Sequence, residues 1–263
     1  MRNQRFVIKC GGSTLAALPS SFYQDLHKLQ TQGRTPVIVH GGGPAISEML
    51  DRLGIASEFI NGLRKTSEAV LDVVEMVLAG QINKEVVRRI QSSGARALGL
   101  SGTDGRLIIA EAVSNWAEVG FVGDVTHVNA ELIEGIAALG YMPVIAPIGL
   151  SQDGQQRYNI NADTAAGAIA SQLGVDQMIV VTDVPGVLKT ERTLQIVLTS
   201  VTRKDIEAMI DNGEIYGGMI PKMRAALQCI QGNVQEVVIV NGTEPGVLSR
   251  VLAGEPVGTR IIR

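Results

Sequence analysis

Short runs of apolar residues recur along the chain, and most of them lead into glycine or a small polar residue. The runs are continuous and do not alternate with polar residues, a pattern typical of strands that are buried on both faces of a sheet. They predict strands at residues 6–9, 36–40, 97–100, 141–146, 177–181 and 236–240.

Segments with apolar residues at three- and four-residue spacing lie between these runs and predict helices. The alternation of strands and helices favours a mostly parallel sheet with right-handed crossovers. Two more polar segments, 107–125 and 149–160, interrupt the alternation and predict hairpins, the second with Asp153-Gly154 as its turn. The helices are predicted at residues 20–32, 44–53, 67–79, 130–139, 163–173, 202–213 and 221–231.

Composition agrees with an α/β fold. The chain has 263 residues, of which 45% are hydrophobic but only 3% aromatic, so the core must consist mainly of aliphatic side chains, as in a sheet covered on both faces. This length suits one large domain or two tightly joined lobes. We predict an N-terminal lobe at 1–175 and a C-terminal lobe at 176–263, separated by a cleft.

Charge and hydropathy exclude several classes of partner. The net charge is −3, and no stretch of lysine and arginine is dense enough to follow a phosphate backbone, so we expect no nucleic-acid partner. No apolar run reaches the roughly 18–20 residues that span a bilayer, and no signal peptide is evident. The two cysteines, Cys10 and Cys229, lie in apolar contexts and are expected to be buried thiols. These features together indicate a cytoplasmic protein.

Glycine-rich turns follow the predicted strands at 9–13 and 41–44, and a third lies at 217–222. Open α/β sheets bind ligands beyond the carboxyl ends of their strands, and consecutive glycine N–H groups can cradle a phosphate. Each turn alone is also compatible with an ordinary tight strand–helix connection. Neither GxGxxG nor GxxxxGK[ST] is present, which disfavours a dinucleotide site and a P-loop.

Two lysines stand at these turns in unusual positions. Lys9 ends an otherwise apolar strand just before the Gly11-Gly12 pair. Lys222 follows Pro221 in the first turn of a predicted helix, where a cation opposes the helix dipole. A phosphate bound at the same place would resolve that conflict, although each lysine taken alone is also compatible with a surface position.

Two polar segments complete the candidate chemistry. Asn161 or Asp163 is a suitable N-cap for the alanine-rich helix that follows. A carboxylate at this strand–helix turn is also suited to hold two lysines in place. Thr182 and Asp183 end another buried strand, where Asp183 either meets a nucleotide or its metal, or only fixes the Pro-Gly turn after it.

Taken together, these motifs resemble those of the amino-acid kinase family over essentially the whole chain. The NGLR and GFVG segments are narrower and are similar to the acetylglutamate kinase branch. In order, the matching motifs are KCGG (9–12), HGGGP (40–44), NGLRKT (61–66), GFVGDV (120–125), NINAD (159–163), TDVPG (182–186), GMIPK (218–222) and GTRI (258–261).

The resemblance implies a three-layer α/β/α sandwich whose N-terminal lobe binds the acyl acceptor and whose C-terminal lobe binds ATP. The implied reaction transfers the γ-phosphoryl group of ATP, carried with Mg²⁺, to the side-chain carboxylate of N-acetyl-L-glutamate. Lys9 and Lys222 would neutralise the phosphoryl group from the acceptor side and the leaving-group side, and Asp163 would orient both lysines. No protein-held metal is implied, since Mg²⁺ bridges the nucleotide phosphates.

The resemblance also assigns binding residues. Gly42, Gly43, Arg64 and Asn159 would bind the acceptor, with Arg64 gripping its α-carboxylate in a bidentate fork. The nucleotide would be bound by Gly11, Gly12, Thr182, Asp183, Gly186, Gly217, Gly218 and Met219.

Oligomeric state and regulation follow from the same resemblance. Arginine-inhibited members of the family carry a helix before the first strand, and that helix builds a hexamer. The first predicted strand of this chain begins near Phe6, which leaves no room for such a helix. We therefore expect a homodimer without arginine feedback. The apolar stripe of the helix at 66–79 is the expected interface element. Some relatives also dock with a nitrogen-signalling protein, which the sequence neither indicates nor excludes. Alternative readings are a kinase of N-acetyl-aminoadipate or an unacetylated amino acid, and a non-catalytic nucleotide sensor.

Overall fold

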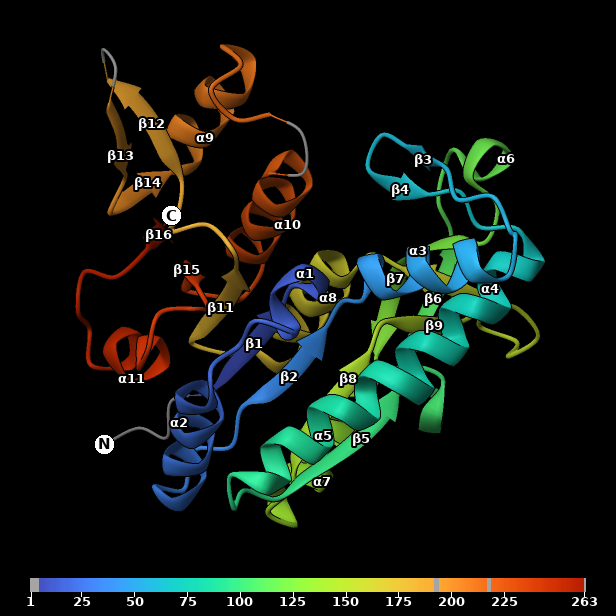
Figure 1. Ribbon diagram of the computed structural model, residues 1–263, viewed down its shortest axis with the longest axis horizontal. Coiled ribbons are helices and arrows are strands. Elements are labelled where there is room, and N and C mark those ends of the chain that lie inside the picture. Colours follow the sequence, from blue (N-terminus) through green and yellow to red (C-terminus); the bar gives the residue numbers. More distant parts are fainter. Residues whose placement is uncertain (1–4, 192–193, 217–218, 263) are drawn as a thin grey trace.

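The computed structural model describes residues 5–191, 194–216 and 219–262 (Figure 1). A central sheet runs through the molecule, and every neighbouring pair of its strands is parallel except β15 and β16. Its order is β14 (Ser200–Thr202), β16 (Thr259–Ile262), β15 (Glu236–Asn241), β11 (Gln177–Thr182), β1 (Phe6–Cys10), β2 (Val37–His40), β8 (Met142–Ala146) and β5 (Ala97–Ser101).

Helices cover both faces of this sheet, because its strands are apolar on both sides. In β1, Ile8 points to one core and Val7 to the other. The first core is closed by α2 (Ser20–Thr31), α3 (Gly43–Arg52), α4 (Glu68–Glu75), α5 (Asn83–Ser92) and α11 (Val247–Leu252). The second is closed by α7 (Ala130–Ala138), α8 (Ala162–Leu173), α9 (Arg203–Asp211) and α10 (Met219–Gln231). The predicted three-layer α/β/α sandwich is therefore confirmed.

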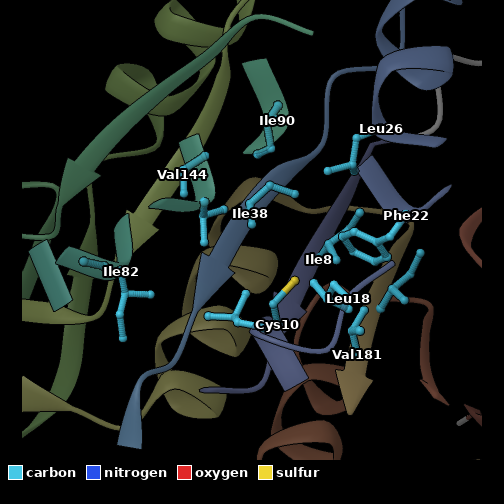
Figure 2. Close-up of a cluster of buried hydrophobic side chains, with 14 of the residues drawn as sticks. Ile8, Cys10, Leu18, Phe22, Leu26, Ile38, Ile82, Ile90, Val144 and Val181 are labelled. Atoms are coloured by element: carbon cyan, nitrogen blue, oxygen red, sulfur yellow. The ribbon is translucent and has the colours of Figure 1, made fainter. Parts of the chain in front are cut away.

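The first core is aliphatic, as the composition predicts. Figure 2 shows Ile8 and Cys10 of β1 beside Phe22 and Leu26 of α2, with Ile38 of β2 on the neighbouring strand. Both cysteines are buried free thiols, and burial raises the pKa of each to about 12. The expectation of buried thiols is confirmed.

Smaller strands form separate sheets. Both predicted hairpins are present, and they combine into one closed barrel made of β6 (Ile108–Ala112), β7 (Val122–Val128), β9 (Ile148–Leu150) and β10 (Arg157–Ile160). Two further hairpins pair β3 (Phe59–Ile60) with β4 (Leu63–Arg64), and β12 (Leu188–Glu191) with β13 (Leu194–Val197). The short helices are α1 (Gly12–Leu15), η2 (Asp104–Arg106) and α6 (Trp116–Val119).

Two details of the prediction were wrong. The strand at 97–100 is not buried on both faces, because β5 is an edge strand, and Leu98 is 42% exposed. The helix predicted to end at residue 79 continues through a π-helical segment, η1 (Met76–Ile82), into α5. Burial of Val77, Leu78 and Ile82 outweighs the low helix propensity of the intervening glycine.

The lobe boundary near residue 175 stays a prediction. The sheet passes through that point without a break, because β1 from the start of the chain pairs with β11 just after it. None of the helices within the described ranges has both the length and the apolarity needed to cross a membrane.

Candidate active site

A cavity of about 360 Å³ lies at the carboxyl ends of β1, β2 and β11. Parallel strands bring their following turns to one edge of the sheet, so segments far apart in sequence meet there. The predicted residues that line the cavity are Lys9, Gly11, Gly12, Gly42, Gly43, Arg64, Asn159, Asp163, Thr182, Asp183 and Lys222.

A carboxylate between two lysines lies in the wall of this cavity. The Nζ atom of Lys9 is 2.7 Å from Oδ1 of Asp163, and Nζ of Lys222 is 3.8 Å from Oδ2 of the same side chain. The side chains of Lys9 and Asp163 are only 4% and 9% exposed. Two ammonium groups and one carboxylate leave a net charge of +1, which suits the binding of an anion.

The start of α8 explains why Asp163 is available to the lysines. Asn161 is the N-cap, and its Oδ1 accepts from the backbone N–H groups of Asp163 at 2.8 Å and Thr164 at 3.3 Å. The alternatives left open by the sequence are thus resolved in favour of Asn161 as the cap. The carboxylate of Asp163 can then face the cavity.

Lys222 lies in the first turn of α10. Its pKa is lowered from the usual lysine value, first by burial and then by the nearby charge of Lys9, while Asp163 and Asp183 oppose that shift. A lysine destabilised in this way is stabilised by an incoming phosphate.

The first two glycine-rich turns touch each other. A Cβ atom on Gly12 would lie 2.6 Å from the backbone nitrogen of Gly42, so no larger residue fits between the turns. Gly43 opens α3, whose first N–H groups have no partners within the helix. Such N–H groups at a helix N-terminus favour an anion in the cavity.

Arg64 is held rigidly at the other end of the cavity. It is 6% exposed, and its Nη2 donates to the Gly43 carbonyl at 3.0 Å and to Ser47 Oγ at 2.9 Å. Its Nη1 donates to Ser57, and the ring of Phe59 lies 4.5 Å from the guanidinium carbon. Burial lowers the pKa of Arg64. The guanidinium is therefore positioned before any ligand arrives.

The remaining predicted residues divide into three groups: those that line the cavity, those that do not, and those outside the described residues. Asn159 lines the cavity and donates from Nδ2 to Thr66 Oγ1 at 3.1 Å, while Asp183 accepts from Ser13 Oγ at 3.4 Å and Thr182 Oγ1 at 3.1 Å. Gly186 and Met219 are not among the residues that line the cavity. Gly217 and Gly218 lie outside the described residues.

Gly186 is needed for packing. A Cβ there would lie 2.5 Å from Thr259 Oγ1, and its φ of +152° is unfavourable for other residues. Thr259 also accepts the backbone N–H of Val187 at 2.8 Å, so this turn joins β11 to β16.

Several cavity residues were missed by the sequence reasoning. They are mainly apolar side chains, and an apolar residue in a loop or helix carries no signal that distinguishes a cavity wall from the core. Usable signals existed for three of them, since Ser13 adjoins the first glycine pair, and Leu63 and Val122 lie within the NGLRKT and GFVGDV motifs. The residues missed include Ser13, Ile46, Phe59, Leu63, Leu78 and Val122.

An α/β/α sandwich with two lysines and a shared carboxylate at its ligand-binding edge is suited to bind a small anionic molecule such as a phosphate compound. The comparisons with known proteins give the family. The family model of the amino acid kinase family matches residues 4–241. The chain belongs to the amino acid kinase family.

Curated relatives are similar over almost their entire length. The chain is 48% identical to the acetylglutamate kinase of Halalkalibacterium halodurans over 238 residues, covering 90% of this chain and 89% of that one. It is 46% identical to the acetylglutamate kinase of Brevibacillus brevis over 256 residues, covering 97% and 96%.

Solved structures agree with this fold. A protein of Streptococcus mutans UA159 is 31% identical, with a TM-score of 0.86 and coverage of 98% of both chains. Carbamate kinase from Giardia lamblia bound to AMP-PNP has a TM-score of 0.73 at 16% identity, covering 100% of this chain and 99% of that one, and it supports the fold alone.

Proposed function

We propose that this protein is an acetylglutamate kinase. It transfers the γ-phosphoryl group of ATP to the side-chain carboxylate of N-acetyl-L-glutamate, giving N-acetyl-L-glutamyl 5-phosphate and ADP, a step of arginine biosynthesis. The observation that carries the proposal is the Lys9–Asp163–Lys222 arrangement in a cavity that also holds Arg64. The identity of 46–48% to curated acetylglutamate kinases supports this acceptor.

The acceptor carboxylate is already ionised near neutral pH, so the reaction requires no general base. An oxygen of that carboxylate forms a bond to the γ-phosphorus while the bond from phosphorus to the β,γ-bridging oxygen breaks, and ADP leaves. Both reactants are anions, so the main task of the protein is to bring them together and balance charge. Lys9 and Lys222 supply the charge, and Asp163 fixes their positions.

The acceptor is bound at the end of the cavity formed by Arg64 and the Gly42–Gly43 turn. Arg64 grips the α-carboxylate, and its partners Ser47 and Ser57 hold the guanidinium in place for that contact. Asn159 adds a hydrogen bond from β10.

The nucleotide is bound on the side of β11, by the Gly11-Gly12 turn and by Thr182 and Asp183. Asp183 presents a carboxylate at the cavity, and Mg²⁺ sites on nucleotides commonly use one or two carboxylates together with the phosphates. These residues therefore fit a nucleotide-borne Mg²⁺, which when bound neutralises phosphate charge.

The assembly is proposed to be a homodimer in the cytoplasm. The apolar stripe expected to form the interface, on the helix at 66–79, is instead buried within the chain, because Val70, Val73, Val74 and Val77 are at most 3% exposed. The neighbouring face formed by η1 and β5 is the candidate interface, since Met76 on η1 is 59% exposed and Leu98 on β5 is 42% exposed. The free thiols Cys10 and Cys229 suit a reducing compartment. Light scattering on the purified chain is expected to give twice the chain mass of 27.9 kDa.

The proposed activity is tested by trapping the acyl phosphate with hydroxylamine. N-acetyl-L-glutamate, glutamate, aspartate and N-acetyl-aminoadipate are assayed in parallel with ATP and Mg²⁺. Hydroxamate from N-acetyl-L-glutamate alone is the expected result. Hydroxamate from another acid would change the assigned substrate but leave the assigned reaction in place. No hydroxamate from any acid would overturn the proposal.

A further inference from the structure

His40 and Asn83 form a fully buried polar pair behind the acceptor end of the cavity. His40 ends β2 directly before the Gly41–Gly43 turn, and Asn83 opens α5; both are 0% exposed. His40 Nδ1 lies 3.1 Å from the Gly41 carbonyl oxygen, and His40 Nε2 lies 3.2 Å from Asn83 Nδ2. The mechanism above uses neither side chain.

The surroundings of Asn83 fix the direction of these hydrogen bonds. Its Nδ2 is 2.9 Å from the Val144 carbonyl oxygen and 3.2 Å from that of Leu100, and carbonyl oxygens only accept. Its Oδ1 accepts from Lys84 Nζ at 3.0 Å. The amide nitrogen therefore faces His40 as a donor that shares its two hydrogens among three acceptors, and it cannot accept a hydrogen from His40.

The direction of that bond assigns the tautomer of His40. Nε2 must be the unprotonated acceptor, so Nδ1 carries the hydrogen and donates it to the Gly41 carbonyl. An imidazolium would place two N–H donors, Nε2–H and the amide of Asn83, against each other in a buried site. Burial lowers the pKa of His40 to about 4, which agrees with a neutral ring.

The bond to Gly41 acts on the acceptor site through the peptide plane. The Gly41 carbonyl and the Gly42 N–H belong to one planar peptide unit and point in opposite directions, so fixing one fixes the other. The π-helical segment η1, which leads directly into Asn83, packs against the turn from a second side, because a Cβ on Gly42 would lie within 2.5 Å of Leu78 and Ile82. The turn between β2 and α3 is thus held by one polar and one apolar contact.

We propose that His40 and Asn83 are positioning residues, which aim the N–H groups of the Gly42–Gly43 turn at the acceptor carboxylate through the Gly41 carbonyl. The proposal rests on the function proposed above, because it assigns those N–H groups to the acceptor. Neither side chain touches the reacting atoms.

The tautomer is tested by long-range ¹H–¹⁵N correlation spectra of the ¹⁵N-labelled protein, with His40→Asn used to assign the signals. His40 is expected to be neutral with the hydrogen on Nδ1, both near neutral pH and at about pH 5.5, above its pKa of about 4. An Nε2–H tautomer, or an imidazolium near neutral pH, would overturn the proposal. This measurement needs no substrate, so it tests the hydrogen bond to Gly41 even if N-acetyl-L-glutamate is not the acceptor.

The effect on the site is tested with two variants that both lose the ring. In His40→Asn the amide nitrogen can occupy the place of Nδ1 and still donate to Gly41, whereas His40→Gln places its amide near Asn83 and leaves Gly41 without a donor. The KM for N-acetyl-L-glutamate is expected to be about tenfold higher in His40→Gln than in His40→Asn, with the KM for ATP equal in both.

Equal acceptor KM values in the two variants would mean that the ring only fills space, and would overturn the proposal. The exposed His127 on β7 provides a control, since His127→Gln is expected to match the parent protein in every constant. If neither variant at position 40 folds, His27→Gln and His127→Gln assign the His40 signals of the parent protein by elimination, and an Nε2–H tautomer there still overturns the proposal.

Discussion

At the scale of single residues, function depends on charges that are held in place before substrates bind. Asp163 is shared by two lysines, and Arg64 has three partners from its own chain. The lysines and Arg64 have lost water on burial and would gain from an anion in the cavity, whereas Asp163 only holds the lysines in place. The unusual positions of both lysines were visible in the sequence, whereas the partners of Arg64 were not, because serines carry no signal of where they fold.

Lys9→Ala and Lys222→Ala are each expected to lower kcat by about two or more orders of magnitude, since each removes a charge that stabilises the transferring phosphoryl group. Removing Lys9 also leaves Asp163 without its closest partner, so a lower melting temperature is expected for that variant. Steady-state kinetics with circular dichroism check both effects. Near-normal kcat in either variant would contradict the charge role.

Arg64→Lys is expected to raise the KM for N-acetyl-L-glutamate about tenfold or more and to leave the KM for ATP unchanged, because an ammonium cannot reproduce both the planar donor geometry of the guanidinium and its bonds to Gly43, Ser47 and Ser57. The exposed Arg52, in the last turn of α3, offers a matched control. Arg52→Lys should have normal kinetics. An unchanged acceptor KM in Arg64→Lys would show that Arg64 does not bind the acceptor.

At the scale of elements, the continuous apolar runs predicted six of the eight central strands and most of the helices, whereas β14, β16, α5 and α11 had no prediction. The assembly of two hairpins into one barrel was not predictable, because β6 pairs with β9 across residues that share no local pattern. The close approach of Leu78 and Ile82 to Gly42 was not predictable either, because these residues are far apart in the sequence and share no local pattern. Local periodicity reports burial and does not report which buried surfaces meet.

That contact gives a prediction for the turn between β2 and α3. Gly42→Ala is expected to destabilise the protein by about 1–3 kcal/mol, because its Cβ would overlap Leu78 and Ile82. A Cβ at the neighbouring Gly43 meets nothing within 4 Å, so Gly43→Ala should retain full stability. Urea unfolding of the two variants makes the comparison. Equal stability would show that the helix moves away at little cost.

At the scale of the whole molecule, helices from opposite ends of the chain are joined by a buried carboxylate. Asp25 of α2 accepts from the backbone N–H of Ser249 at 3.3 Å and from its hydroxyl at 2.7 Å, in the first turn of α11. The N-cap of α11 is Gly246, which has no side chain, so Asp25 acts as a cap supplied by another helix. A pairing across 224 residues has no counterpart in local sequence.

Asp25→Ala is expected to cost about 1–3 kcal/mol of unfolding free energy, because it removes both bonds to α11. Ser249→Ala should cost less, since the backbone N–H remains. A double-mutant cycle measured by urea unfolding is expected to show coupling between the two positions. Strictly additive losses would mean that the two side chains act independently.

The place of β1 has a consequence for how the chain is synthesised. This strand leaves the ribosome long before its partner β11, so Phe6 must wait for Gln177 before its second edge is covered. Until then, an apolar strand has an open edge, which is a site for aggregation. A fragment ending at residue 175 would keep that edge permanently, so the part of the chain before β11 would depend on the rest for its solubility.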